Sequence, residues 1–159
     1  MASGKSSAGR ALALRCSMRF VDTDTLISDR YGAIEEIFKR DGEDAFRQME
    51  REVATELATL SGLVIATGGR MMLDDHCAQF LGSKGRVFCL HASVEEIQRR
   101  YAADSQGPVR PLLASSEEDE LLKLYAERSE AYSQFEQILT DGKSVDEVVE
   151  QIGSLLSDG

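Results

Sequence analysis

The sequence predicts an α/β domain in which short parallel strands alternate with helices. Several of the candidate strands are unbroken apolar runs, which is typical of a parallel sheet covered on both faces. Helical patterns separate these runs, and such alternation favours right-handed crossovers in a doubly wound sheet. With 159 residues, 42% of them hydrophobic, the chain is long enough for one compact domain and too short for two ordinary ones. We therefore expect residues 1–159 to form a single domain. The four candidate strands are Arg19–Asp22, Leu63–Ala66, residues 86–90 and residues 135–139.

The helices are predicted from composition, periodicity and capping signals. Residues 7–14 are mostly good helix formers, and apolar side chains recur every three or four positions between residues 44 and 60. Ser93 with Glu96, and Ser144 with Glu147, have the spacing of a capping box that opens a helix. A further long, charged helix is expected to begin at Ser116.

Two stretches depart from simple alternation. Residues 26–42 predict two short helices with a break at Gly32. Residues 102–116 have no periodicity and contain Gly107, Pro108 and Pro111, which indicates a long loop. Loops of this length in compact domains are often lids or binding segments.

The charge balance restricts the possible partners. Acidic residues outnumber basic ones by 28 to 18, which gives a formal net charge of −10. Nucleic acids and anionic membrane surfaces are bound through Lys and Arg, so we expect neither as a partner. A site for a small anion must instead gather the few cations locally.

Other classes of protein are excluded by what the sequence lacks. No apolar run approaches the ~20 residues of a membrane span, and the N-terminus has no signal-peptide pattern, so we expect a cytoplasmic protein. Three widely spaced cysteines fit no disulfide framework, and two distant histidines lack metal-ligand spacing. Nothing in the sequence determines the oligomeric state; we expect a monomer.

The N-terminal residues 3–7, Ser-Gly-Lys-Ser-Ser, match the second half of the phosphate-binding motif GxxxxGK[ST]. In such a loop, backbone N–H groups at a helix N-terminus surround the phosphates of ATP, and the lysine reaches the β and γ oxygens. Lys5 would take that role, and the Ser6 hydroxyl would join the shell of a bound Mg²⁺. A short Gly-Lys-Ser sequence is also common by chance, so a plain helix start is the alternative. The other residues of the ATP-binding loop would be Ser3, Gly4 and Ser7.

Six segments, taken in order, resemble the shikimate kinase family: SGKSSAGRALA, FVDTDTLI, GEDAFRQMERE, ATGG, RPLL and AERSEAYSQF. The resemblance runs from Ser3 to about Phe135 and implies a three-layer P-loop kinase fold with a short parallel sheet. It also implies a substrate-binding helical region at residues 26–60 and a lid at residues 102–116. The implied reaction is the ATP-dependent, Mg²⁺-assisted phosphorylation of the 3-hydroxyl of shikimate.

The resemblance implies roles for two aspartates and one arginine around the reacting groups. Asp24 would accept a hydrogen bond from the reacting hydroxyl and help to orient or deprotonate it. Asp22, which we expect on the opposite side of a strand from Asp24, would face the Mg²⁺ through water. The alternative for this pair is an Asx turn and helix N-cap, and both interpretations are compatible. Arg110, in the lid, would close over the phosphates and stabilise the transferred charge.

The resemblance also implies how the acceptor is held. Arg47 would bind the carboxylate of the substrate. On a helix, Glu50 and Arg51 lie beside it at i+3 and i+4, so Glu50 can hold its guanidinium. Arg128 would supply a second contact to the acceptor. Gly68 and Gly69 would let the backbone approach the substrate closely. For the arginines, the alternative is an ordinary solvent-exposed side chain.

Three features depart from the family pattern. Arg70 stands where a third glycine normally follows Gly68 and Gly69, and it could point away, add a cation to the acceptor site or block it. The segment 140–144 lacks the proline that often packs on the adenine, which leaves the nucleobase contact open. The first strand, which lies in the middle of the family's sheet, is missing from this chain, so we expect poor folding and weak activity unless the N-terminus is extended.

Shikimate kinase activity is therefore the leading hypothesis from the sequence. A kinase for another small hydroxylated acid would use the same machinery, with Arg70 altering the acceptor. A catalytically silent relative that binds nucleotide is the third hypothesis, although such a protein does not require Asp24, Arg47, Arg110 and Arg128 together.

Overall fold

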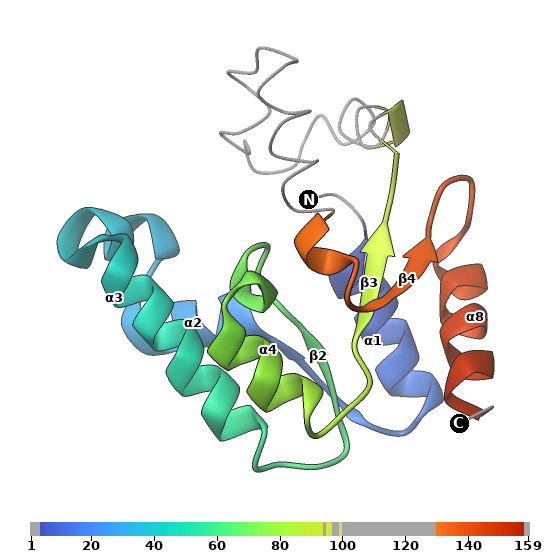
Figure 1. Cartoon of the computed structure of the whole chain (residues 1–159), viewed down its shortest axis with the longest axis horizontal. Helices are drawn as coiled ribbons and strands as arrows, with labels where there is room; N and C mark the ends of the chain where they lie inside the picture. Colours follow the sequence, from blue (N-terminus) through green and yellow to red (C-terminus); the bar gives the residue numbers. More distant parts are fainter. Residues whose placement is uncertain (1–3, 94, 97–98, 100–129, 158–159) are drawn as a thin grey trace.

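The computed structural model describes residues 4–93, 95–96, 99 and 130–157, and its four strands form two separate parallel pairs (Figure 1). Strand β1 (Arg19–Asp22) pairs with β2 (Leu63–Ala66), with Arg19 opposite Leu63. Strand β3 (Phe88–His91) pairs with β4 (Glu136–Leu139), with Phe88 opposite Glu136. All four predicted strands are confirmed, and the last two begin one or two residues later than expected.

Helices cover both faces of these strands, as expected for an α/β fold. Helix α1 (Lys5–Arg15) packs against α8 (Val145–Ser157) and against β2. On β2, Leu63 and Ile65 pack toward one apolar core and Val64 toward the other, because successive side chains of a strand alternate between faces. The buried residues beside α1 and α8 are Ala8, Leu12, Ile138, Val148, Val149 and Ile152.

The second core lies under three further helices: α2 (Thr23–Tyr31), α3 (Ile34–Leu57) and α4 (Asp75–Gly82). Gly32, with a φ of 97°, ends α2, so the predicted break is confirmed. Gly42 has φ 85° and ψ 174° and interrupts α3, which separates the short helix before it from the long amphipathic helix after it. Both conformations are reached easily only by glycine.

The capping signals were correct, whereas one helical region was missed. Ser144 N donates to Glu147 Oε2 over 2.7 Å and Glu147 N donates to Ser144 Oγ over 3.3 Å at the start of α8. Glu96 N likewise donates to Ser93 Oγ over 3.2 Å. The sequence gave no prediction for the short 3₁₀ turn η1 (Met71–Leu73) or for α4. The signal that could have located α4 is Asp74, whose carboxylate caps it by accepting from Cys77 N.

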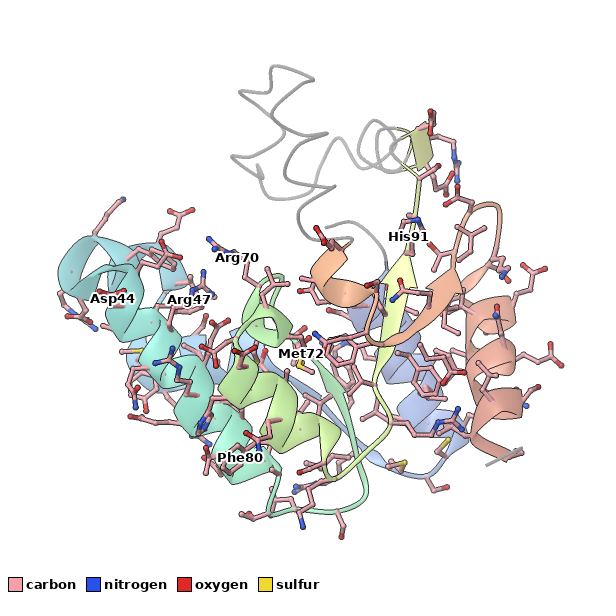
Figure 2. The ribbon with its side chains drawn as sticks, viewed as in Figure 1. Asp44, Arg47, Arg70, Met72, Phe80 and His91 are labelled. Atoms are coloured by element: carbon pink, nitrogen blue, oxygen red, sulfur yellow. The ribbon has the colours of Figure 1, made fainter. Side chains whose placement is uncertain are left out.

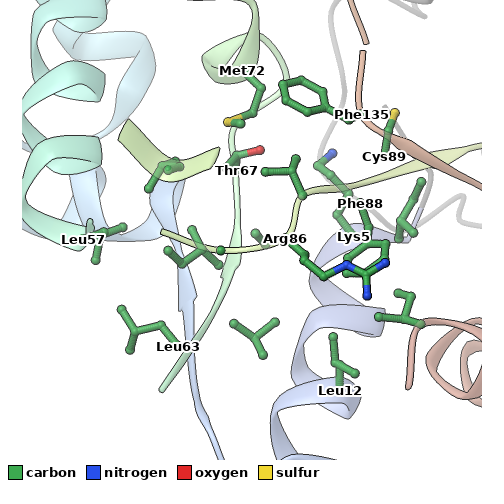
Figure 3. A pocket seen from close by; sticks show the side chains of 18 of the residues that line it. Lys5, Leu12, Leu57, Leu63, Thr67, Met72, Arg86, Phe88, Cys89 and Phe135 are labelled. Carbon is green, nitrogen blue, oxygen red and sulfur yellow. The ribbon is translucent and has the colours of Figure 1, made fainter. Parts of the chain in front are cut away.

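A cavity of about 840 Å³ separates the two strand pairs (Figure 3). Its walls include the apolar strand residues Leu63 and Ile65 on one side and Phe88 and Leu90 on the other, with Leu12 of α1 nearby. Within the described residues, β2 pairs only with β1 and β3 only with β4. Among the described residues, no strand therefore lies between β2 and β3.

Several predicted features lie outside the described residues. These are the lid at residues 102–116, the helix expected from Ser116, and the site residues Ser3, Arg110 and Arg128. Among the described helices, none has the length and apolar character that crossing a bilayer requires.

Candidate active site

The phosphate-binding segment lies at the N-terminus of α1. Gly4 precedes the helix in the left-handed conformation, with φ 81° and ψ 18°, and Lys5 is the first helical residue. The first helical hydrogen bond runs from Ala8 N to Gly4 O over 2.9 Å. Gly4 has no side chain that could cap the helix, and the positive end of the helix dipole favours an anion at this position.

Ser6 and Asp22 meet beside this segment. Ser6 Oγ donates a hydrogen bond of 2.8 Å to Asp22 Oδ2. The other carboxylate oxygen of Asp22 caps α2 by accepting from Asp24 N at 3.1 Å and Thr25 N at 3.2 Å. The two interpretations of this carboxylate, as helix cap and as partner of the phosphate-binding loop, are thus true together.

The expectation that Asp22 and Asp24 lie on opposite sides of one strand was wrong. Residues two apart on a strand share a face, so a common strand would have pointed both side chains to the same side. In the structure Asp22 is the last residue of β1, whereas Asp24 belongs to the first turn of α2.

Ser6 and Asp22 form a donor set that suits Mg²⁺. A hydroxyl and one carboxylate supply oxygen ligands, and Mg²⁺ is commonly held by one or two protein carboxylates together with water and substrate phosphates. No group of three His, Cys, Asp or Glu residues that could hold a metal occurs among the described residues.

Asp24 is influenced by charges from both the phosphate-binding segment and α3. Burial raises the pKa of its carboxyl group, the nearby charge of Asp22 adds to this effect, and Lys5 and Arg47 oppose it. Asp24 thus interacts electrostatically with Lys5 of the phosphate-binding segment and with Arg47 of α3. A carboxylate with a raised pKa is a better proton acceptor than an exposed one.

Gly68 leaves the space that Asp24 occupies. A Cβ atom at this position would lie 2.5 Å from Asp24 Oδ1 and 3.2 Å from Glu50 Oε1. Its backbone N–H donates to Thr23 Oγ1 over 2.9 Å, and Thr23 is fully buried. The sequence analysis singled out Gly68 for a close approach to substrate, but it missed Thr23, which fixes the turn after β2 against α2.

Arg47 of α3 is bound by two carboxylates. Its Nη1 donates to Glu50 Oε2 over 2.6 Å, and its Nη2 donates to Glu43 Oε1 over 3.0 Å. The expectation that Glu50 holds the guanidinium is confirmed, whereas Arg51 turns away and donates to Asp74 Oδ2 over 2.9 Å. Burial raises the pKa of Glu50, and Arg47 partly offsets that effect.

Arg70 extends toward the same region as Arg47 (Figure 2). Its Nη1 lies 3.3 Å from Glu43 Oε1, the oxygen that also accepts from Arg47. The preceding Gly69 is held by Tyr132, whose hydroxyl donates to Gly69 O over 2.8 Å. Glu43 and Tyr132 were not among the predicted site residues, and Tyr132 belongs to the segment AERSEAYSQF.

Comparison with known proteins agrees with this geometry. The family model described as "Shikimate kinase" matches residues 1–157. The chain belongs to the shikimate kinase family. A curated shikimate kinase of Geobacter sulfurreducens is 41% identical over 159 residues, covering 98% of this chain and 86% of the relative. One from Francisella tularensis subsp. holarctica is 36% identical over 158 residues, covering 96% of this chain and 88% of the relative.

Solved shikimate kinases share the fold. The enzyme of Acinetobacter baumannii, solved in complex with shikimate, superposes with a TM-score of 0.86 at 32% identity and covers 99% of this chain and 89% of the solved one. The enzyme of Aquifex aeolicus gives a TM-score of 0.82 at 31% identity, with coverages of 99% and 92%. The predicted P-loop kinase fold is thereby confirmed.

A second cavity, of about 290 Å³, lies on the other side of the phosphate-binding segment of this shikimate kinase family member. It is lined by residues of three regions: Gly4, Ser7 and Ala8 at the start of α1, Glu96 and Arg99, and Thr140, Lys143, Ser144, Val145 and Val148 after β4. Asp141 Oδ1 accepts from Ser93 N over 2.9 Å and so fixes this loop to the end of β3. The segment 140–144, which lacks the expected proline, therefore lies beside the phosphate-binding residues.

Proposed function

We propose that this chain transfers the terminal phosphoryl group of ATP to the 3-hydroxyl of shikimate. The observation that carries the proposal is the position of Asp24, which interacts electrostatically both with Lys5 on the phosphate side and with Arg47 on α3. A kinase must bring two anions together, and cations on both sides of one carboxylate supply that arrangement. The membership of the family and the relative solved with shikimate support shikimate as the acceptor.

The residues on the phosphate side bind and neutralise the nucleotide. Lys5 and the N–H groups of the first turn of α1, with Ser3, Gly4 and Ser7, hold the phosphates. Ser6 and Asp22 would hold Mg²⁺, which neutralises phosphate charge when bound. Arg110 of the lid would add its charge over the transferred group. The cavity between α1 and the loop after β4 takes the nucleobase.

The residues on the acceptor side orient the substrate. Arg47, with its guanidinium fixed by the buried Glu50, binds the carboxylate of the acceptor, and Arg128 supplies a second contact. Asp24 accepts the hydrogen bond of the reacting hydroxyl and receives its proton as the new O–P bond forms. Gly68 and Gly69 allow the substrate to lie against the backbone after β2. We expect the enzyme to act as a cytoplasmic monomer without nucleic acid or membrane partners.

A coupled ADP-release assay with shikimate tests the proposal. Asp24→Asn should lower kcat by about 100-fold or more, because the hydroxyl loses its proton acceptor. Asp29→Asn, on the exposed side of the same helix, is the matched control and should keep wild-type turnover. If the wild-type enzyme releases ADP with another hydroxylated acid but not with shikimate, that acid is the acceptor and shikimate is not. Tight ATP binding without turnover of any acceptor would support a silent relative instead.

A further inference from the structure

Two guanidinium groups converge on one carboxylate oxygen at the acceptor side of the site. Glu43 Oε1 accepts from Arg47 Nη2 at 3.0 Å and from Arg47 Nε at 3.3 Å. Arg70 Nη1 donates to the same oxygen at 3.3 Å. Arg47 comes from α3 and Arg70 from the turn after β2, so a carboxylate links two elements that are distant in sequence (Figure 2).

The two carboxylate partners of Arg47 differ in how easily they can be displaced. The side chain of Glu50 is 2% exposed, and removing its ion-pair partner would leave a buried charge uncompensated. The side chain of Glu43 is 51% exposed, so water can solvate it when it leaves, and exposed ion pairs contribute little stability. An incoming anion therefore replaces Glu43 and leaves Glu50 in place.

The local charge explains why a second cation matters. Arg47 with Glu43 and Glu50 forms a group with one positive and two negative charges, which repels a further carboxylate. Arg70 brings the group to neutrality. After Glu43 has been displaced, Arg47 and Arg70 outnumber Glu50, and the group attracts an anion.

The backbone of the turn accommodates Arg70 without strain. Its φ of −124° and ψ of −3° do not require glycine. The following Met71 and Met72 are buried, which fixes the position from which the side chain extends. The backbone of this arginine is thus held by its neighbours, while its side chain is 53% exposed and accessible to ligand.

We propose that Arg70 is a second carboxylate-binding residue of the acceptor site. The carboxylate of the acceptor takes the place of Glu43 between Arg47 and Arg70, so that Glu43 is an internal competitor of the substrate. The inference rests on the proposed function in one respect, namely that the acceptor is a carboxylic acid. Arg70 acts as a specificity-determining residue, because an acceptor without the negative charge cannot displace Glu43.

Steady-state kinetics and calorimetry of Arg70 variants test the first half of this inference. Arg70→Ala should raise both the KM and the Kd for shikimate about five- to twentyfold, while kcat and the KM for ATP stay within about twofold of wild type. Arg70→Lys should raise the KM and the Kd for shikimate less, because a lysine keeps the positive charge but cannot form the bidentate hydrogen bonds of a guanidinium. The matched control is Arg40→Ala, an arginine of α3 that pairs only with Asp41 among the described residues and is 59% exposed.

A neutral acceptor distinguishes charge recognition from a general effect on the site. With the carboxamide of shikimate, wild type and Arg70→Ala should have the same KM, because there is no carboxylate to bind. Glu43→Gln should lower the KM for shikimate about two- to fivefold, since the competing charge is removed. If Glu43 served only to hold Arg47 and Arg70 in position, Glu43→Gln would raise the KM for shikimate instead.

The outcomes separate this inference from the proposed function. Unchanged shikimate affinity in Arg70→Ala, tighter binding in that variant, or a higher KM in Glu43→Gln would each overturn the inference while leaving the kinase activity intact. If the wild type binds shikimate without phosphorylating it and Arg70→Ala weakens that binding, the inference stands and the proposed function fails. If the wild type neither binds nor phosphorylates shikimate, both are wrong.

Discussion

Ser6 and Asp22, 16 positions apart, are joined by a 2.8 Å hydrogen bond between the first turn of α1 and the end of β1. The same carboxylate caps α2, the helix that carries Asp24. One aspartate thus contacts both the Ser6 hydroxyl and the start of the helix that carries Asp24. In the proposed mechanism, metal binding and acceptor orientation are therefore coupled through this side chain.

Asp22→Asn should therefore impair both functions. We expect kcat to fall about 10- to 100-fold and the Mg²⁺ concentration for half-maximal activity to rise, because the remaining amide is a weaker ligand for a hard cation. Titration of Mg²⁺ at saturating ATP and shikimate measures both quantities. Asp29→Asn, at an exposed position of α2, is the matched control for the exchange of a carboxylate for an amide. A normal Mg²⁺ requirement in Asp22→Asn would leave this carboxylate with its capping role alone.

Gly68→Ala should disrupt the site by displacing Asp24. The added methyl group would lie 2.5 Å from Asp24 Oδ1, so the carboxylate must move from its present position. We expect kcat to fall at least tenfold, with a smaller effect on the KM for ATP. Gly85→Ala is the matched control, because a Cβ there meets nothing within 4 Å. Similar kinetics for the two alanine variants would show that Asp24 does not need its present position.

The sequence predicted the parts of this fold that depend on local signals. The capping boxes at Ser93 and Ser144 and the break at Gly32 depend on residues a few positions apart, and all three are present. The contact between Arg70 and Glu43 joins residues 27 positions apart, and no periodicity or motif encodes it. Among the three orientations left open for Arg70, the structure favours the one that adds a cation beside Arg47.

The orientation of Asp22 relative to Asp24 and the start of α4 were not predicted correctly. The resemblance indicated which side chains belong to the site, but Asp22 and Asp24 were expected on one strand, whereas β1 ends at Asp22 and Asp24 lies in the first turn of α2. Helix α4 was missed because its start depends on the Asp74 cap, and that signal was not considered. Such boundaries are the least reliable part of a prediction from one sequence.

The raised pKa of Asp24 predicts a trade-off between activity and stability. Burial and the charge of Asp22 make ionised Asp24 unfavourable in the folded protein, so the folded state holds its proton more tightly than the unfolded state does. The resulting destabilisation is absent below the ordinary pKa of about 3.9 and grows as the pH rises through the raised value. Asp24→Asn removes the ionised form, and we expect its Tm to exceed that of the wild type by ~2–5 °C at pH 7.

Thermal unfolding of both proteins between pH 3.5 and pH 8 measures this trade-off. The difference in Tm should shrink toward zero at the acidic end, where Asp24 is protonated in the wild type as well. Asp29→Asn, at an exposed position of the same helix, should show no such pH dependence. A variant at position 24 that is less stable than wild type at pH 7 would mean that the ionised carboxylate stabilises the fold.

The cavity between β2 and β3 predicts that an added strand stabilises the protein. Both neighbouring strands are four residues long and parallel to their partners, and each has one edge without a strand partner among the described residues. An apolar segment of about five residues placed ahead of Met1 would satisfy both edges and fill the apolar cavity of about 840 Å³. We expect the extended chain to melt at least ~5 °C higher than the unextended chain and to turn over shikimate faster.

The composition of the added segment provides the control. A segment of the same length with lysine at alternate positions should give no gain, because charged side chains cannot enter a cavity lined by residues such as Leu63, Val64, Phe88 and Leu90. A third version with a central proline should also fail, since proline removes a donor from the ladder. Equal melting temperatures and equal kcat values for the extended and unextended chains would contradict the expectation, and would mean that the two strand pairs are stable as they stand.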